Sequence, residues 1–182
     1  IESRGLGDVY KRQFSYSEGV DVLKDISFNV NKGEKIAIVG ATGSGKTTII
    51  NLLTRFYQTT QGSIEIDDID INNMDLYSLR SNIALVLQDD FLFADSLLNN
   101  ITIWNKTISF DNVVKAAKKI GIHDFIMSLP GGYNYNVKER GVMISQGQRQ
   151  LISFLRAYLK NPSILILDEA TSSIDSNSEE LI

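Results

Sequence analysis

The sequence of 182 residues contains no cysteine, so no disulfide framework can stabilise it, which fits a reducing compartment. It has no apolar run of the length that spans a bilayer, and no signal-peptide pattern opens it. The positive charge typical of nucleic-acid-binding proteins is also missing, because the net charge is −4. With 43% hydrophobic and 22% charged residues, the composition is that of a globular polypeptide.

The clearest motif is GATGSGKT at residues 40–47, which fits the phosphate-loop pattern GxxxxGK[ST]. The backbone N–H groups of such a loop point inward at a phosphate chain, because side chains would block its approach. Lys46 is expected to reach the β- and γ-phosphates, and the Thr47 hydroxyl is expected to bind Mg²⁺. The alternative is a glycine-rich turn without a ligand. The expected phosphate-binding residues are Gly40, Gly43, Ser44, Gly45, Lys46, Thr47 and Thr48.

The segments around this motif have the pattern that a phosphate loop requires. Residues 35–39, Lys35 followed by the apolar run 36–39, predict a strand. After the loop, residues 48–56 carry apolar side chains at positions 49, 52, 53 and 56, the spacing of an amphipathic helix. A strand, a glycine loop and a helix in this order favour the phosphate-loop interpretation.

Two kinds of strand are expected. Runs without polar alternation are typical of parallel strands buried on both faces, and they occur at residues 36–39, 83–87 and 164–167. Residues 26–30 and 62–66 alternate instead, which predicts half-exposed strands, the second nearer a sheet edge. A turn at residues 31–34 is expected to join the first of these to the phosphate-loop strand as a hairpin. We therefore predict an α/β fold with a mostly parallel sheet and a small antiparallel β element at the N-terminal side.

Helical periodicity dominates the region between residues 89 and 160. We predict helices over residues 75–82, 111–120, 123–129 and 148–160. The sequence thus predicts an α/β core that contains the phosphate loop, made of residues 14–88 and 161–182, and that is interrupted by an α-helical subdomain at residues 89–160.

The two ends differ from the rest of the chain. Residues 1–13 show neither strand nor helix periodicity, so we interpret them as a non-native leader and exclude them from the fold. A native frayed terminus is the alternative. A helix is expected to begin near Ser176, and the chain stops within it, which indicates a fragment.

Two carboxylates, Asp168 and Glu169, directly follow the apolar run 164–167. Ligands of parallel sheets bind at the carboxyl ends of strands, so both are expected to face the bound phosphates. Asp168 is suited to hold Mg²⁺, directly or through water. Glu169 is then free to polarise an attacking water as a general base. An acidic helix N-terminus that follows a strand is the alternative.

Together these motifs resemble the nucleotide-binding domain of an ATP-binding-cassette (ABC) transporter. Residues 144–148, ISQGQ, correspond to the signature usually written LSGGQ in this family, and Ser145, Gly147 and Gln148 match it. Ile144 and Gln146 depart from that pattern. The helix N-terminus at Gly147 and Gln148 favours anions.

Two further residues carry the resemblance. Gln88 matches the glutamine that closes the strand before the helical insertion of this family. Tyr16 lies thirty residues before Lys46, where the family has an aromatic residue that stacks on adenine. For Tyr16 alone, packing within a strand is the alternative role.

The resemblance implies a P-loop NTPase fold with ATP and Mg²⁺ as cofactors. It implies that ATP is sandwiched between two head-to-tail domains, with the γ-phosphate contacted by the signature of the opposite domain. The implied catalytic residues are Glu169, Lys46 and Gln88. The implied metal-binding residues are Thr47, Gln88 and Asp168. The implied nucleotide contacts outside the phosphate loop are Tyr16, Ser145, Gly147 and Gln148.

Residues 139–141 (Glu-Arg-Gly) and 87–93 are similar to elements of exporters rather than importers. In those proteins the domain is fused to a membrane-spanning domain, whose coupling helices contact the helical insertion. The resemblance thus implies a place at the cytoplasmic face of the cell membrane, as part of a transporter, with no nucleic-acid partner. Phe91, Leu92 and Phe93 are candidates for the apolar lining of that contact. Packing inside the insertion is the alternative.

The family also has a switch histidine on a later strand, and this chain ends before it. The only histidine here, His123, lies in the helical insertion, where a surface or capping role is expected. The later strand normally pairs beside the phosphate-loop strand, so its loss predicts an exposed hydrophobic edge.

The leading prediction is ATP binding and hydrolysis by the nucleotide-binding domain of an ABC exporter, which powers transmembrane transport. One alternative is a fragment that binds nucleotide without hydrolysing it. Another is a soluble ABC ATPase that is not fused to a membrane domain, which the acidic charge balance and residues 139–141 disfavour.

Overall fold

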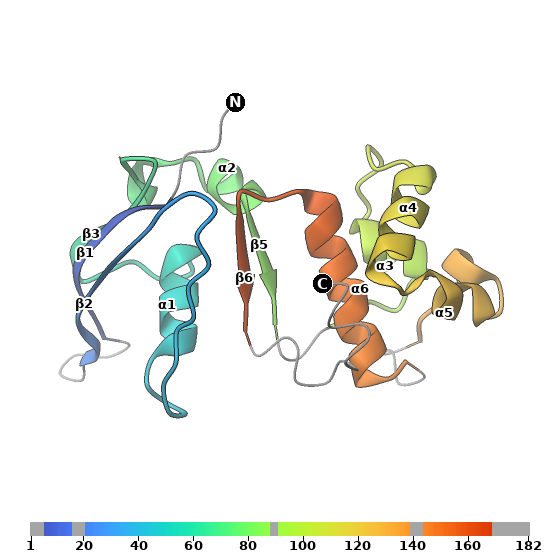
Figure 1. The fold of residues 1–182 in the computed structure, drawn as a ribbon, viewed down its shortest axis with the longest axis horizontal. Coiled ribbons are helices and arrows are strands. Elements are labelled where there is room, and N and C mark those ends of the chain that lie inside the picture. Colours follow the sequence, from blue (N-terminus) through green and yellow to red (C-terminus); the bar gives the residue numbers. More distant parts are fainter. Residues whose placement is uncertain (1–5, 16–20, 88–90, 139–143, 169–182) are drawn as a thin grey trace. The chain divides into compact units, whose positions relative to one another are not determined.

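The computed structural model describes residues 6–15, 21–87, 91–138 and 144–168. The chain divides into two units, Ile1–Ile83 and Ala84–Ile182. The first unit is built on a four-stranded antiparallel sheet with the strand order β2-β1-β3-β4 (Figure 1). Its strands are β1 (Leu6–Ser15), β2 (Asp21–Val30), β3 (Gln61–Ile66) and β4 (Ile69–Asp70). This sheet confirms the predicted antiparallel element and the strands predicted at residues 26–30 and 62–66.

The prediction that residues 1–13 lie outside the fold is wrong for residues 6–13, because these residues belong to strand β1. Val9 pairs with Phe28 of β2 on one side and with Ile64 of β3 on the other. The register between β1 and β2 shifts repeatedly along the strand. Each such irregularity interrupts the regular residue-by-residue pairing of the two strands. The period-2 signal that identifies a strand in a sequence is therefore absent from β1.

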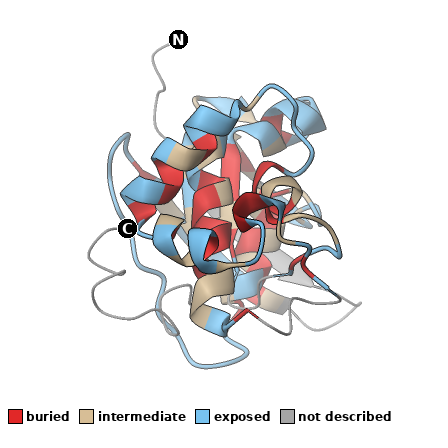
Figure 2. Cartoon of the chain, turned by 90° about the vertical axis from the view of Figure 1, so that its right-hand side faces the viewer, coloured by how far each residue is buried: buried red, intermediate tan, exposed pale blue. Residues whose placement is uncertain are grey.

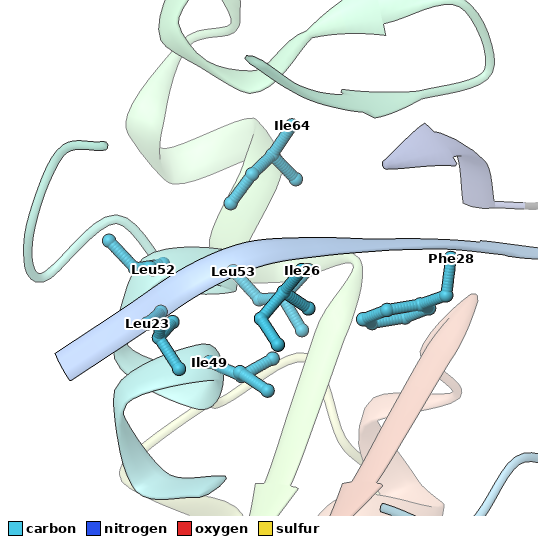
Figure 3. Close-up of a pocket in the computed structure, with 7 residues that line it drawn as sticks. All are labelled: Leu23, Ile26, Phe28, Ile49, Leu52, Leu53 and Ile64. Carbon is cyan, nitrogen blue, oxygen red and sulfur yellow. The ribbon is translucent and has the colours of Figure 1, made fainter. Parts of the chain in front are cut away.

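Helix α1 (Lys46–Leu53) packs on the sheet through apolar side chains. Figure 3 shows these side chains around a small pocket between the helix and strands β2 and β3. The lining residues are Leu23, Ile26, Phe28, Ile49, Leu52, Leu53 and Ile64. The apolar spacing of the sequence thus identified the face by which α1 is held in place.

The predicted end of this helix at residue 56 is wrong, because α1 ends at Leu53. Thr54 is the C-cap, and its Oγ1 donates to the carbonyl of Ile50 at 2.8 Å. Arg55 has a φ of 52°, and its guanidinium donates to the carbonyls of Ile71 and Met74 at 2.8 and 2.7 Å. These contacts stabilise a turn where the periodicity alone predicted a further helical turn.

Residues 35–39 do not form the predicted strand, so the predicted hairpin with β2 is also wrong. The turn before them is present, because the N–H of Glu34 donates to the carbonyl of Asn31 at 3.0 Å. A strand exists only through pairing with a neighbour, and within the described ranges no strand hydrogen-bonds to this segment. Its apolar side chains are exposed, most of all Val39 at 92%.

Helix α2 (Leu76–Ser81) confirms the helix predicted at residues 75–82. Asp75 is its N-cap and accepts the N–H of Ser78 at 2.8 Å. Between α1 and α2 lies the short helix η1 (Ile71–Asn73). Arg80 of α2 donates to the carbonyls of Thr54 and Arg55 at 3.0 and 3.2 Å, so α2 is tied to the end of α1.

The second unit is mainly helical. Its helices are α3 (Leu97–Thr102), α4 (Phe110–Ile120), α5 (His123–Ser128), η2 (Gly132–Asn134) and α6 (Gln146–Lys160). The three helices predicted in this region are confirmed, and α6 begins two residues earlier than predicted. Figure 2 shows their buried residues on the inner sides of the helices, where they form one core. Within the described part of the chain, no helix has the length and apolar character to cross a membrane.

Strands β5 (Ile83–Val86) and β6 (Ile164–Leu167) confirm two of the three predicted apolar strands. They form a separate two-stranded sheet, and their arrows point the same way in Figure 1, as in a parallel pair. Ala84 and Val86 of β5 pack against Phe154 and Ala157 of α6.

The prediction of a mostly parallel sheet does not hold for the described strands, whose other pairings are antiparallel. The missing strand at residues 35–39 accounts for part of the difference. Strand β6 is also less buried than predicted, since Leu165 and Leu167 are exposed. Burial on both faces requires a layer of side chains on each, whereas Leu165 lines an open groove beside α4 and α6.

Candidate functional site

The phosphate-loop residues lead directly into α1, as predicted. Gly43 and Gly45 have φ values of 82° and 94°, which glycine adopts without strain. Gly45 is the N-cap of α1, and no side chain caps this helix. The first turn of an α-helix leaves N–H groups without intrahelical acceptors. The loop therefore presents a helix N-terminus that is suited to bind an anion.

Position 45 favours glycine for two reasons, which are its left-handed backbone conformation and the lack of room for a side chain. A Cβ at this position would lie 2.5 Å from Cδ2 of Leu23 and 3.4 Å from the carbonyl oxygen of Val22. We expect Gly45→Ala to lower the free energy of unfolding by about 1–2 kcal/mol through left-handed strain alone, and further through displacement of Leu23. Chemical denaturation measures the loss. Gly33→Ala is the matched control, because Gly33 has a φ of 80° but open space around it; equal losses in both variants would contradict the role of the Leu23 contact.

The Lys46 ammonium lies inside the loop. Its Nζ donates to the carbonyl of Gly40 at 2.7 Å and to that of Ala41 at 3.2 Å. The Ser44 N–H also donates to Ala41, at 3.1 Å. The loop is thus wrapped around a positive charge whose present acceptors are neutral carbonyls. A phosphate oxygen forms a stronger, charge-assisted hydrogen bond with such a group.

A metal ion at a nucleotide site requires oxygen donors of the kind that Mg²⁺ prefers. There Mg²⁺ keeps several waters and is held by one or two protein groups together with phosphates. In the first unit, the hydroxyl of Thr47 is exposed on the first turn of α1 and is a donor of this kind. In the second unit, the carboxylate of Asp168 is another. Across the described ranges, no group of three or more His, Cys, Asp or Glu side chains forms a metal site by itself.

Asp168 directly follows strand β6 in the second unit. Its N–H donates to the carbonyl of Val86 at 2.9 Å, which extends the pairing of β6 with β5 by one step. Asp168 therefore lies at the carboxyl end of a parallel strand, where ligands of such sheets bind. Tyr16, Gln88 and Glu169 lie outside the described residues.

The signature residues form the start of α6. Ser145 is the N-cap, and its Oγ accepts the N–H of Gln148 at 3.2 Å. The Gln148 side chain in turn accepts the N–H of Ser145 at 3.0 Å, which completes a capping box. Ile144 is buried and Gly147 lies in the first turn. In this structure Ser145 and Gln148 cap the N-terminus of α6.

The three apolar residues proposed for the membrane-domain contact separate into two groups. Leu92 is fully buried at 0% exposure and belongs to the helical core, as the packing alternative predicted. Phe91 (57%) and Phe93 are exposed. Their rings meet edge to face, and Phe93 makes the same contact with Trp104. The sequence did not point to Trp104, because all of helix α3 lies between Phe93 and Trp104 in the sequence.

Asp95 fixes the position of Trp104. One carboxylate oxygen accepts the indole N–H of Trp104 at 2.8 Å, and the other accepts the side-chain amide of Asn99 at 3.0 Å and the N–H of Ser96. These hydrogen bonds, above all that from Asn99, lower the pKa of Asp95. We call Phe91, Phe93 and Trp104 the aromatic patch.

A phosphate loop that begins a helix within a mixed α/β chain defines the P-loop NTPase class. A family model described as "ABC transporter" matches residues 23–172. The chain belongs to the ABC transporter family and has its ATPase fold.

Known relatives extend well beyond this chain. Proteins of Staphylococcus aureus, strains bovine RF122 / ET3-1 and NCTC 8325, each named "Putative multidrug export ATP-binding/permease protein", are 47% identical over 180 residues. The match covers 98% of this chain and 31% of each relative. A solved structure of a bacterial Atm1-family ABC exporter with ATP bound superimposes with a TM-score of 0.93 at 40% identity. It is matched over 100% of this chain and 32% of its own length.

Proposed function

We propose that this chain binds and hydrolyses ATP as the motor domain of a longer ABC exporter. The observation that carries the proposal is the loop that places the Lys46 ammonium 2.7 Å from the carbonyl of Gly40, at the N-terminus of α1. Membership of the ABC transporter family and similarity to export ATP-binding/permease proteins support it.

The proposed roles follow the chemistry of phosphoryl transfer, which depends on positioning and charge neutralisation. Lys46 and the loop amides bind the phosphates, and Tyr16 stacks on adenine. Glu169 accepts the proton of the attacking water. Thr47, Gln88 and Asp168 hold Mg²⁺, whose charge offsets that of the phosphates.

A second domain completes the proposed site. Ser145, Gly147 and Gln148 contact the γ-phosphate bound by the other domain of a head-to-tail dimer, identical or different. The Ser145–Gln148 capping box supports this role because it fixes the first turn of α6, where a helix favours anions. A negative charge delivered there would lie next to fixed N–H donors.

We further propose that the aromatic patch receives a coupling helix of the membrane domain, which places this chain at the cytoplasmic face of the membrane. Two features support an apolar partner. The rings of the patch are exposed yet mutually packed, and Trp104 is held by Asp95 rather than free to rotate. A fixed, exposed aromatic surface of this kind typically marks an interaction site.

The finer features of the predicted fold also remain proposals. We propose that residues 14–88 and 161–182 form one core around the helical subdomain 89–160.

Equilibrium ATP binding and phosphate release, measured on the full-length protein, test the proposed function. We expect tight binding in the presence of Mg²⁺ and continuous phosphate release. Binding without release would favour the alternative of a nucleotide-binding module. Absence of binding would refute both.

A further inference from the structure

A network of hydrogen bonds joins the middle of α6 to the segment that carries the aromatic patch. Arg156 donates from Nε to the carbonyl of Asn100 at 2.7 Å and from Nη1 to the carbonyl of Phe91 at 3.0 Å. Its Nη2 donates to Oδ1 of Asn100 at 3.2 Å. A guanidinium presents these donors in a fixed planar fork, so one side chain holds two separate stretches of backbone.

Asn100 extends this network into the patch. Its side chain is completely buried at 0% exposure. Its Oδ1 accepts the N–H of Phe93 at 2.7 Å, and its Nδ2 donates to the carbonyls of Phe93 and Ser96, both at 3.0 Å. A buried amide whose two ends are satisfied fixes the backbone around it, because any displacement leaves polar groups unpaired.

These hydrogen bonds connect the backbone of the patch to α6. The backbone of Phe91 and of Phe93 is fixed to Arg156, directly or through Asn100. Arg156 lies eleven residues from Ser145 along a continuous helix, a distance of roughly 16 Å at the rise of an α-helix. Buried residues along α6, such as Ile152 and Leu155, keep the helix in place within its core.

We propose that Arg156 and Asn100 are positioning residues that couple the aromatic patch to the Ser145 end of α6. A displacement of the patch by a partner then moves the signature residues, and nucleotide-driven closure at Ser145 moves the patch. The inference rests on the proposed function, in which the patch contacts the membrane domain and Ser145 contacts ATP.

A double-mutant cycle in the full-length protein tests this coupling, since a contiguous set of contacts alone is not evidence of it. Phe93→Ala perturbs the patch, and Arg156→Lys keeps the positive charge but loses the fork. ATP turnover is measured for the wild type, both single variants and the double variant. Asn100→Asp, which replaces the amide donors by an acceptor, gives a second cycle if Arg156→Lys fails to fold.

We expect non-additive effects. In the Arg156→Lys background, Phe93→Ala should change ATP turnover little further. The turnover of the double variant should therefore differ by about threefold or more from the value obtained by multiplying the two single effects. The KM for ATP should stay near the wild-type value in Arg156→Lys, because Arg156 has no proposed contact with nucleotide, while kcat changes.

Arg80→Lys is the matched control. Arg80 also donates to two backbone carbonyls, those of Thr54 and Arg55, but in the other unit. Its cycle with Phe93→Ala should be additive. An additive cycle for both Arg156→Lys and Asn100→Asp overturns the coupling while leaving the proposed function intact. No effect of Phe93→Ala on turnover overturns the docking role of the patch and the coupling together, and absence of wild-type turnover overturns the proposed function itself.

Discussion

Lys46→Ala is expected to weaken ATP binding by about 30-fold or more, and to abolish turnover at millimolar nucleotide. The Lys46 ammonium lies within a loop whose carbonyls, those of Gly40 and Ala41, it bonds at 2.7 and 3.2 Å. Loss of one partner of a hydrogen-bonded charge pair costs about 2 kcal/mol or more, and 2 kcal/mol corresponds to about 30-fold in affinity. The measurement is equilibrium binding of ATP to the full-length protein.

Lys35→Ala removes the same charge from the segment that precedes the loop, where the side chain is exposed. Its affinity for ATP should stay within about twofold of the wild type, as for most surface substitutions. If both lysine variants lose affinity equally, the effect of Lys46 is one of net charge. The proposed direct contact with phosphate would then be wrong.

The parts of the fold that the sequence predicted well are those determined by local interactions. Helix α4 has an N-cap at Ser109 and left-handed Gly121 at its C-terminus, and both signals lie within a residue or two of the helix they delimit. The capping box of α6 is also local, since Ser145 and Gln148 are three residues apart, but it was not predicted, and the helix begins two residues earlier than expected. Such contacts can be read from spacing alone.

The parts that the sequence did not predict depend on distant residues. Strand β1 is a strand because β2 and β3 pair with it, despite a broken register. Residues 35–39 have a strong strand pattern but no partner strand among the residues that the structure describes. Helix α1 ends early because Arg55 bonds the carbonyls of Ile71 and Met74.

The same limit applies to the candidate site. The phosphate loop is a continuous motif, and its glycines have the backbone conformations that the pattern implies. Arg156 and Asn100 are 56 residues apart in the sequence. Neither belongs to a sequence motif that would predict their contact. Only the tertiary structure brings the guanidinium to the two carbonyls that it binds.

Glu169→Gln is expected to lower ATP turnover by about 10²–10⁴-fold, the usual contribution of a general base. Glutamine has nearly the same shape as glutamate but accepts no proton, so ATP binding should be retained. Asp168, the preceding residue, is fixed at the end of β6 by its bond to Val86 at 2.9 Å. Phosphate release and equilibrium binding, measured on the same preparation, separate the chemical step from binding.

Two comparisons determine what the Glu169→Gln result means. Asp168→Asn should reduce turnover and also weaken the Mg²⁺ dependence of nucleotide binding, because Asp168 is proposed to hold the metal. Glu65→Gln makes the same chemical change on strand β3, where Glu65 accepts a hydrogen bond from Ser63 at 3.2 Å, and should leave turnover within about twofold. Wild-type turnover in Glu169→Gln would remove Glu169 from the role of base and leave the activation of water to another group.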